Sequence, residues 1–127
     1  MQDHPSAAAI LELATAQLGA DAPADAGQAR FERRVIAAAL QLVRRALALS
    51  PASDAAEHGR LTALLDATGD LAALNRMLCA RIRAGELSAS TPGLSAHLRA
   101  TALEKLAIDQ PTYAAYRRAL ETSGSRA

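Results

Sequence analysis

The feature that most constrains the fold is the segment from Gln28 to Leu49, where apolar residues recur at helical spacing over about six turns. Its predicted buried stripe consists of Phe31, Val35, Leu42, Ala46 and Leu49. The opposite side carries Arg30, Arg34, Gln41 and Arg45. Alanine and leucine dominate the chain, and both favour closely packed helices. Because there are few β-branched runs and no alternating pattern, the sequence predicts an all-α protein.

Further helices are predicted at about residues 5–18, 53–68, 70–85, 91–108 and 109–120. Ser50-Pro51 is expected to end the long helix, since proline disfavours a helical residue before it. Asp54 with Glu57 has the pattern of a capping box, and Thr91-Pro92 has that of a helix start. Helices of this number predict a compact antiparallel bundle of five to six helices, with one domain over residues 1–121 and a flexible tail over 122–127.

The predicted core faces of the later helices follow from the same spacing. One comprises Leu71, Leu74, Leu78 and Ile82, and another comprises Leu94, Leu98, Ala102 and Leu106. The single cysteine, Cys79, is expected to be a small buried side chain. Asn75 lies at the edge of an apolar stripe, so it is expected either to link helices or to mark a partner surface.

Composition excludes several classes of function. The formal net charge of +1 gives no general attraction to nucleic acid or anionic membrane. The longest apolar segment, Val35 to Val43, is shorter than the roughly 20 residues of a membrane span, and no signal peptide is indicated. His4, His58 and His97 fall on different predicted elements and form no metal-binding motif, so no metal or cofactor is expected. We therefore expect a cytoplasmic protein that is not an enzyme, with no nucleic-acid or membrane partner.

The arginines of the long helix are the first candidate site. Arg30, Arg33 and Arg34 lie near the helix N-terminus, where the dipole disfavours cations by about 0.3–1 kcal/mol each. Acids from another helix, plain solvation, or an acidic or phosphate-bearing partner could offset this cost. Arginine's planar fork suits carboxylate and phosphate alike.

The Asp109-Gln110-Pro111-Thr112-Tyr113 turn is the second candidate site. In a structural interpretation, Asp109 caps the last helix and Tyr113 packs at the corner. In a functional interpretation, Asp109, Tyr113 and Arg117 form a recognition corner, because Tyr113 and Arg117 are one helical turn apart. Tyrosine and arginine are common among residues that dominate interfaces. Both interpretations can hold together.

Several motifs also resemble an uncharacterised family of small all-helical bacterial proteins. The resemblance rests on MQDHPSA, Arg30-Phe31, Arg34-Val35, Gly69-Asp70-Leu71, Leu74-Asn75, Leu78-Cys79, Arg81-Ile82 and LRATALEKLAIDQPTY. The chain departs from the family where Ala37-Ala38-Ala39 stands in place of a segment that often contains asparagine. Genes of this family commonly lie beside an aminoglycoside-phosphotransferase-like kinase and an acyl-CoA dehydrogenase.

The resemblance implies an accessory protein that binds and stabilises or activates such a kinase in hydroxyacyl-CoA or acyl-CoA catabolism. The contact residues expected for this partner are Arg30, Arg33, Arg34, Asp109, Tyr113 and Arg117. One alternative is a helical bundle that binds acyl-CoA or another anion, with arginines on the phosphates. The other alternative is a self-associating scaffold, a homo-oligomer that binds no ligand.

Overall fold

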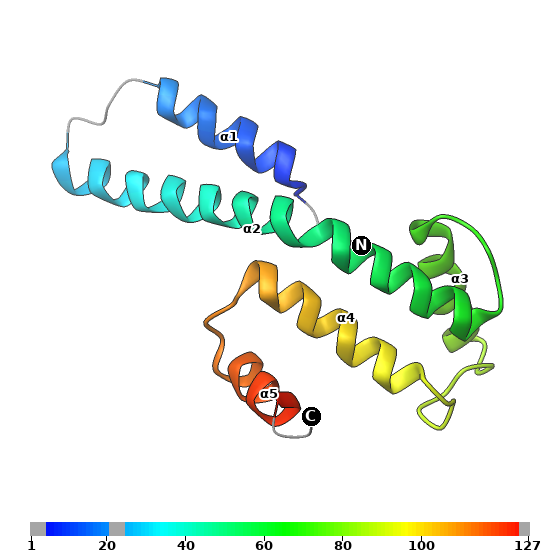
Figure 1. The fold of residues 1–127 in the computed structure, drawn as a ribbon. Coiled ribbons are helices and arrows are strands. Elements are labelled where there is room, and N and C mark those ends of the chain that lie inside the picture. The colour runs from blue at the N-terminus through cyan, green and yellow to red at the C-terminus, as the bar shows by residue number, and fades with distance from the viewer. Residues whose placement is uncertain (1–4, 21–24, 125–127) are drawn as a thin grey trace. The chain divides into compact units, whose positions relative to one another are not determined.

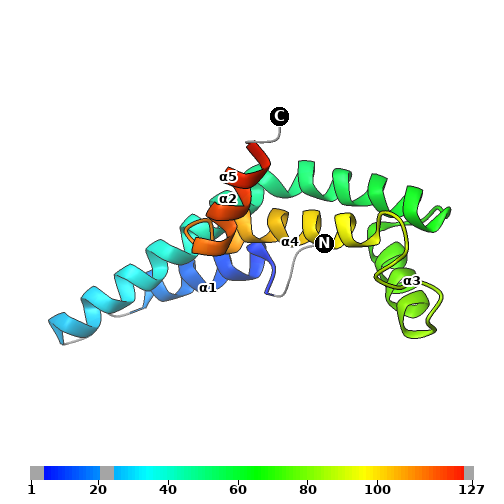
Figure 2. The ribbon, with the colours of Figure 1, turned by 90° about the horizontal axis from the view of Figure 1, so that it is seen from below.

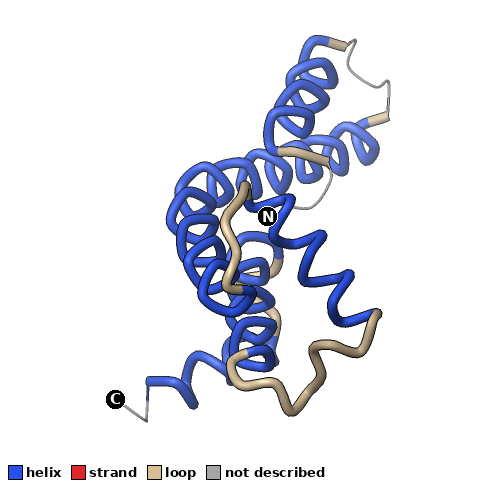
Figure 3. The backbone as a smooth tube through the Cα atoms, turned by 90° about the vertical axis from the view of Figure 1, so that its right-hand side faces the viewer, coloured by secondary structure: helices blue, strands red, loops and turns tan. Residues whose placement is uncertain are grey.

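A computed structural model describes residues 5–20 and 25–124, and these residues form helices, turns and bends without a strand (Figure 3). The helices within these ranges are α1 (Ala7–Gly19), α2 (Ala26–Leu65), α3 (Leu71–Arg83), α4 (Leu94–Asp109) and α5 (Ala114–Gly124). The all-α prediction is therefore confirmed. The compact antiparallel arrangement of all helices stays a prediction, because the chain divides into two compact units, Gln2–Leu49 and Ser50–Ala127.

In the N-terminal unit, α1 lies along the first part of α2 (Figure 1). The Ser6 hydroxyl accepts a hydrogen bond from the Ala9 N–H at 3.2 Å, so Ser6 caps α1 and the helix starts after Pro5. Gln17 Nε2 donates to Glu32 Oε2 at 3.4 Å. Since this bond joins the end of α1 to the start of α2, the two helices run antiparallel.

The covered face of α2 differs from the predicted stripe. Val43 and Ala46 are buried, and they share a face with Glu32, which α1 contacts. Phe31 and Val35, which begin the predicted stripe, are 66% and 51% exposed. At about 100° per residue, the covered face is rotated by about 75° from that stripe. The apolar arc of α2 is thus wider than the surface that α1 covers.

The prediction that Ser50-Pro51 ends the long helix is wrong, because α2 continues through Pro51 to Leu65. Proline in a helix interior removes one backbone hydrogen bond and costs about 3 kcal/mol. The preceding turn, Ala46 to Leu49, consists of alanine and leucine, and Ala52, Ala55 and Ala56 follow the proline, so helix propensity offsets part of this local cost. Asp54 and Glu57 consequently lie inside a helix and do not form a capping box.

The length and composition of α2 also satisfy the criteria for a membrane-crossing helix, and no other described helix does. A core helix of an ordinary globular protein can have the same length and composition. Arg44 and Arg45 lie at the middle of the stretch between Arg34 and Asp54. An arginine at the centre of a spanning helix costs about 2.5–3.5 kcal/mol, so the sequence of α2 disfavours a span.

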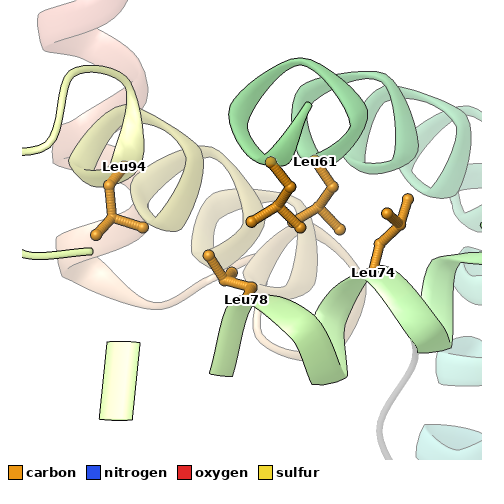
Figure 4. Close-up of a cluster of buried hydrophobic side chains, with 5 residues drawn as sticks. Leu61, Leu74, Leu78 and Leu94 are labelled. Atoms are coloured by element: carbon orange, nitrogen blue, oxygen red, sulfur yellow. The ribbon is translucent and has the colours of Figure 1, made fainter. Parts of the chain in front are cut away.

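The C-terminal unit is built around a leucine cluster from three helices. In this unit α4 lies alongside the last turns of α2, and α3 lies near the Leu65 end (Figures 1 and 2). The buried members are Leu61, Leu65, Leu74, Leu78 and Leu94. In Figure 4, Leu74 and Leu78 point from α3 toward Leu61 on α2. Full burial of a leucine side chain contributes about 1.5–3 kcal/mol, so this cluster is the main source of stability in the unit.

Local capping explains where the later helices begin and end. The Asp70 carboxylate accepts from the Ala73 N–H at 2.6 Å and starts α3 as expected. Thr91-Pro92 does not start α4. Its threonine side chain accepts from the Ser88 N–H at 2.9 Å within the preceding turn. Helix α4 begins after Gly93, whose φ of 84° lies in the left-handed region that favours glycine.

Candidate functional site

The first candidate site is the basic start of α2. Arg30, Arg33 and Arg34 are exposed, and the structure gives none of them a hydrogen-bond or ion-pair partner among residues 5–20 and 25–124. The nearby acid, Glu32, accepts instead from Gln17 and from Gln28 Nε2 at 3.0 Å. No acid from another helix pairs with these arginines in the described part of the chain. Solvation, or an external acidic or phosphate-bearing partner, is left to offset the cost of their position.

One local acid does stabilise this end of α2. Oδ1 of Asp25 accepts from the N–H groups of Gly27 and Gln28, both at 3.0 Å. A carboxylate here satisfies free amides and opposes the helix dipole, worth about 1 kcal/mol. This cap compensates for part of the unfavourable arginine placement without pairing with any arginine.

The second candidate site is the corner between α4 and α5. Asp109 is exposed and is the last residue of α4, so the prediction that it caps the final helix is wrong. Gln110 follows as the C-cap, and its N–H donates to the Leu106 carbonyl at 2.9 Å. The α4 helix therefore ends at Asp109, one residue later than predicted, because helical backbone bonds continue to that residue.

Tyr113 and Arg117 lie on the far side of that corner. Tyr113 directly precedes α5, and its carbonyl accepts from the Arg117 N–H at 3.1 Å. Both side chains are exposed, Tyr113 by half. The corner therefore presents a tyrosine and an arginine one turn apart. The arginines at the start of α2 belong to the N-terminal unit and this corner to the C-terminal unit.

A third, partly buried polar cluster was not predicted as a unit. Arg60 on α2 donates to Glu104 on α4 through both terminal nitrogens, Nη1 to Oε1 at 2.8 Å and Nη2 to Oε2 at 2.6 Å. Nη2 also lies 3.4 Å from the Thr101 hydroxyl. Two parallel bonds between a guanidinium and a carboxylate are the strongest form of this pair. Glu104, expected as an ordinary surface charge, thus joins two helices.

Glu57, Asn75 and His97 extend the cluster toward α3. Glu57 and His97 are each only 3% exposed. Asn75 Nδ2 donates to Glu57 Oε1 at 2.7 Å and to the Leu71 carbonyl at 3.0 Å. The prediction that Asn75 links helices is confirmed. Because each buried polar group needs a partner, this arrangement fixes how α2 and α3 meet.

The charges of the cluster act on His97. Burial lowers the pKa of the His97 imidazole below its ordinary 6.5, and the positive charge of Arg60 lowers it further. The carboxylates of Glu57 and Glu104 act in the opposite direction. Burial raises the pKa of the Glu57 carboxyl, but hydrogen bonds to the carboxylate, including the one from Asn75, leave this pKa below its ordinary 4.5. The imidazole is therefore held neutral near pH 7, as a buried side chain with Nδ1 unpartnered among the described residues.

The polar side chains of this cluster hold α2, α3 and α4 together. Its carboxylates are engaged by a guanidinium and an amide, and its histidine is almost fully buried, which suits a role in stability. Within the described ranges, no group of three or more His, Cys, Asp or Glu is arranged to hold a metal ion. Cys79 is exposed, so the prediction of a buried cysteine is wrong. It lies one position after buried Leu78, on the outer side of α3.

A family model described as a domain of unknown function (DUF6285) matches residues 23–113, more than two-thirds of the chain. The chain belongs to the DUF6285 family. No curated protein and no solved structure matches the chain.

The DUF6285 match includes α2, α3 and α4, and therefore both the basic start of α2 and the buried polar cluster. It ends at Tyr113, so Asp109 and Tyr113 lie inside it and Arg117 lies outside. The N-terminal helix α1 also lies outside the match.

The DUF6285 region contains a signal that could have revealed the cluster. The buried side of α4 runs through Leu94, His97, Thr101, Glu104 and Ile108, spaced by three and four residues. The predicted stripe with Leu98 and Ala102 is wrong, because both are exposed. A face that mixes apolar and polar residues escapes a search for apolar periodicity alone. Glu57 three residues before Arg60 gives the matching polar pair on α2.

Proposed function

We propose that the chain is a non-catalytic accessory protein that binds a protein partner. The partner is an aminoglycoside-phosphotransferase-like kinase in hydroxyacyl-CoA or acyl-CoA catabolism, which the chain stabilises or activates in the bacterial cytoplasm. The observation that carries the proposal is the start of α2, where exposed Phe31 and Val35 lie beside arginines without partners in the described residues. The kinase itself comes from the family resemblance described above.

The surface chemistry supports partner binding. Exposed apolar side chains next to charged ones mark interaction surfaces more often than scattered single leucines do. Aromatic and arginine side chains carry much of the binding energy at such surfaces. The corner with Tyr113 and Arg117 offers the same residue types and is the second contact in this proposal. The proposal also includes a compact antiparallel bundle of the helices. Small-angle scattering would test this, with an expected radius of gyration of about 14 Å.

Co-expression with the neighbouring kinase tests the proposal. We expect the two proteins to elute together in size-exclusion chromatography and the kinase to gain activity or thermal stability. Arg30→Glu with Arg34→Glu should weaken co-elution by reversing the charge of the contact. Arg76→Glu, an exposed charge on α3, is the matched control and should leave co-elution unchanged. Separate elution of the wild-type proteins with unchanged kinase activity would refute the proposal.

A second candidate, favoured by the same arginines, for which the described residues supply no partner, is an anion-binding protein that holds the phosphates of a CoA ester. Guanidinium groups bind phosphate through paired hydrogen bonds. A thermal-shift titration with acyl-CoA and with free CoA distinguishes this candidate. A concentration-dependent rise in Tm that Arg30→Glu removes would favour it over the kinase partner, and no rise would exclude it.

A further inference from the structure

A second row of positions runs along α2 beside the face that α1 covers. We name this row the seam; it consists of Phe31, Val35, Ala38, Leu42, Arg45 and Leu49. Its spacing alternates between four and three residues, which is the heptad spacing with which two helices pack along a common line. From Phe31 to Leu49 the seam is about 27 Å long, at 1.5 Å per residue.

The seam is largely uncovered within the N-terminal unit. Phe31 and Val35 are more than half exposed, Leu49 is 39% exposed and Leu42 is intermediate. The side that α1 covers is the neighbouring one, which carries Glu32 and the buried Val43. A heptad row left open along five turns is the surface that an additional helix covers.

The charges beside the seam select the kind of helix. Arg34 and Gln41 border its open side, and Arg30 lies one turn before Arg34. The segment Gln28–Leu49 carries five arginines against one glutamate, and that glutamate is held by Gln17 and Gln28. A second copy packed on this seam would bring the same arginines, Arg30, Arg34 and Arg45, near one another, which like-charge repulsion opposes. A helix with carboxylates at its flanking positions would pair with them.

We infer that the seam binds an amphipathic helix of another protein, whose own apolar heptad row is flanked by Asp and Glu. This inference rests on the proposed partner-binding function and specifies the contact surface and the chemistry of the partner. Apolar packing along Phe31, Val35 and Leu42 supplies affinity, and Arg30 and Arg34 select acidic partners and set their register.

Two synthetic peptides test the inference on the full chain. Both have leucine and alanine at the heptad core positions; one has glutamate at the flanking positions and the other has lysine. We expect the glutamate peptide to bind, with affinity that falls as salt rises, and the lysine peptide to bind at least about tenfold more weakly. Equal binding of both peptides, or no binding of either, would overturn the inference.

Matched substitutions on α2 locate the contact. Phe31→Ala with Val35→Ala should weaken the glutamate peptide by about tenfold or more, as loss of interface anchors does. Leu47→Ala is the control, because Leu47 is 69% exposed but lies off the seam. A larger loss from Leu47→Ala would place the contact elsewhere. Circular dichroism should show unchanged helicity in all variants, since the replaced side chains are exposed.

Other occupants of the seam give distinct results. A dimer in analytical ultracentrifugation that Val35→Ala dissolves would identify a second copy and overturn the inference. Binding to phosphatidylserine vesicles without binding to the glutamate peptide would identify a membrane and also overturn it. If the peptide binds but the kinase does not co-elute, the proposed function fails and the seam stands. If the kinase still co-elutes with the Phe31→Ala, Val35→Ala variant, the seam inference fails and the proposed function stands.

Discussion

We expect a measurable coupling energy between Arg60 and Glu104, which form an ion pair in the C-terminal unit. Glu104→Gln removes the negative charge and leaves a partly buried guanidinium without its carboxylate. The two side chains are 27% and 26% exposed, so the pair lies between an exposed pair, worth about 0–1 kcal/mol, and a fully buried one, whose loss costs about 3–5 kcal/mol. We expect Glu104→Gln to lower the free energy of unfolding by about 2 kcal/mol.

Urea unfolding of a double-mutant cycle measures this directly. Arg60→Met removes the other partner, and the double variant should lose less than the sum of the single losses, with a coupling of about 1.5 kcal/mol. In a cooperative unit of 60–100 residues, a loss of 2 kcal/mol lowers Tm by about 8–16 °C. The single and double variants should unfold with the wild-type m-value, because the folded structure is retained.

A matched pair elsewhere in the unit provides the control. Arg81 Nε and Glu86 Oε2 are 3.9 Å apart with both side chains more exposed, so Glu86→Gln should cost less than about 0.5 kcal/mol. If the Arg60 and Glu104 substitutions add to within about 0.3 kcal/mol, the bidentate pair does not stabilise the fold, and the argument that it locks α2 to α4 is refuted.

Three further predictions follow from single residues. The folded-state pKa of His97 lies below 6.5, so the unfolded chain binds more protons below about pH 6.5 and stability should be lost as the pH falls through this range. Urea unfolding at several pH values should show that the free energy of unfolding of His97→Gln depends less on pH than that of the wild type. An unchanged pH dependence would contradict this. Gly93→Ala should cost about 1–2 kcal/mol through its positive φ alone, since its Cβ would lie 3.8 Å from Leu64 Cδ1, whereas Gly59→Ala inside α2 should be neutral or stabilising. Cys79 should react with Ellman's reagent in the native protein as fast as in urea, and protection of the native thiol would show that it is covered.

The helical character and several helix ends could be predicted from the sequence. Alanine and leucine at helical spacing gave the correct fold class, and Asp70 and Gly85 lie at the ends of α3 as expected. These features depend on a few neighbouring residues, through backbone conformation and capping. The basic start of α2 was equally visible, because arginines at a helix N-terminus are unfavourable regardless of the rest of the fold.

Only the tertiary structure decided which helix faces are buried and whether a helix-breaking residue ends its helix. Pro51 disfavours a helix locally, yet α2 continues through it, since packing and propensity on both sides outweigh one lost hydrogen bond. The buried face of α4 includes His97 and Glu104, because Arg60 and Glu57 on another helix lie against it.

The sequence by itself thus determined that the chain is helical, where α3 begins and ends, and that α2 carries a wide apolar arc with arginines beside it. The structure decided that α1 covers only part of that arc and leaves Phe31 and Val35 exposed. It also decided that polar side chains join α2, α3 and α4. The physical reason is that periodicity reports the preference of each helix for a buried side, whereas the side that is buried depends on which residues the neighbouring helices present.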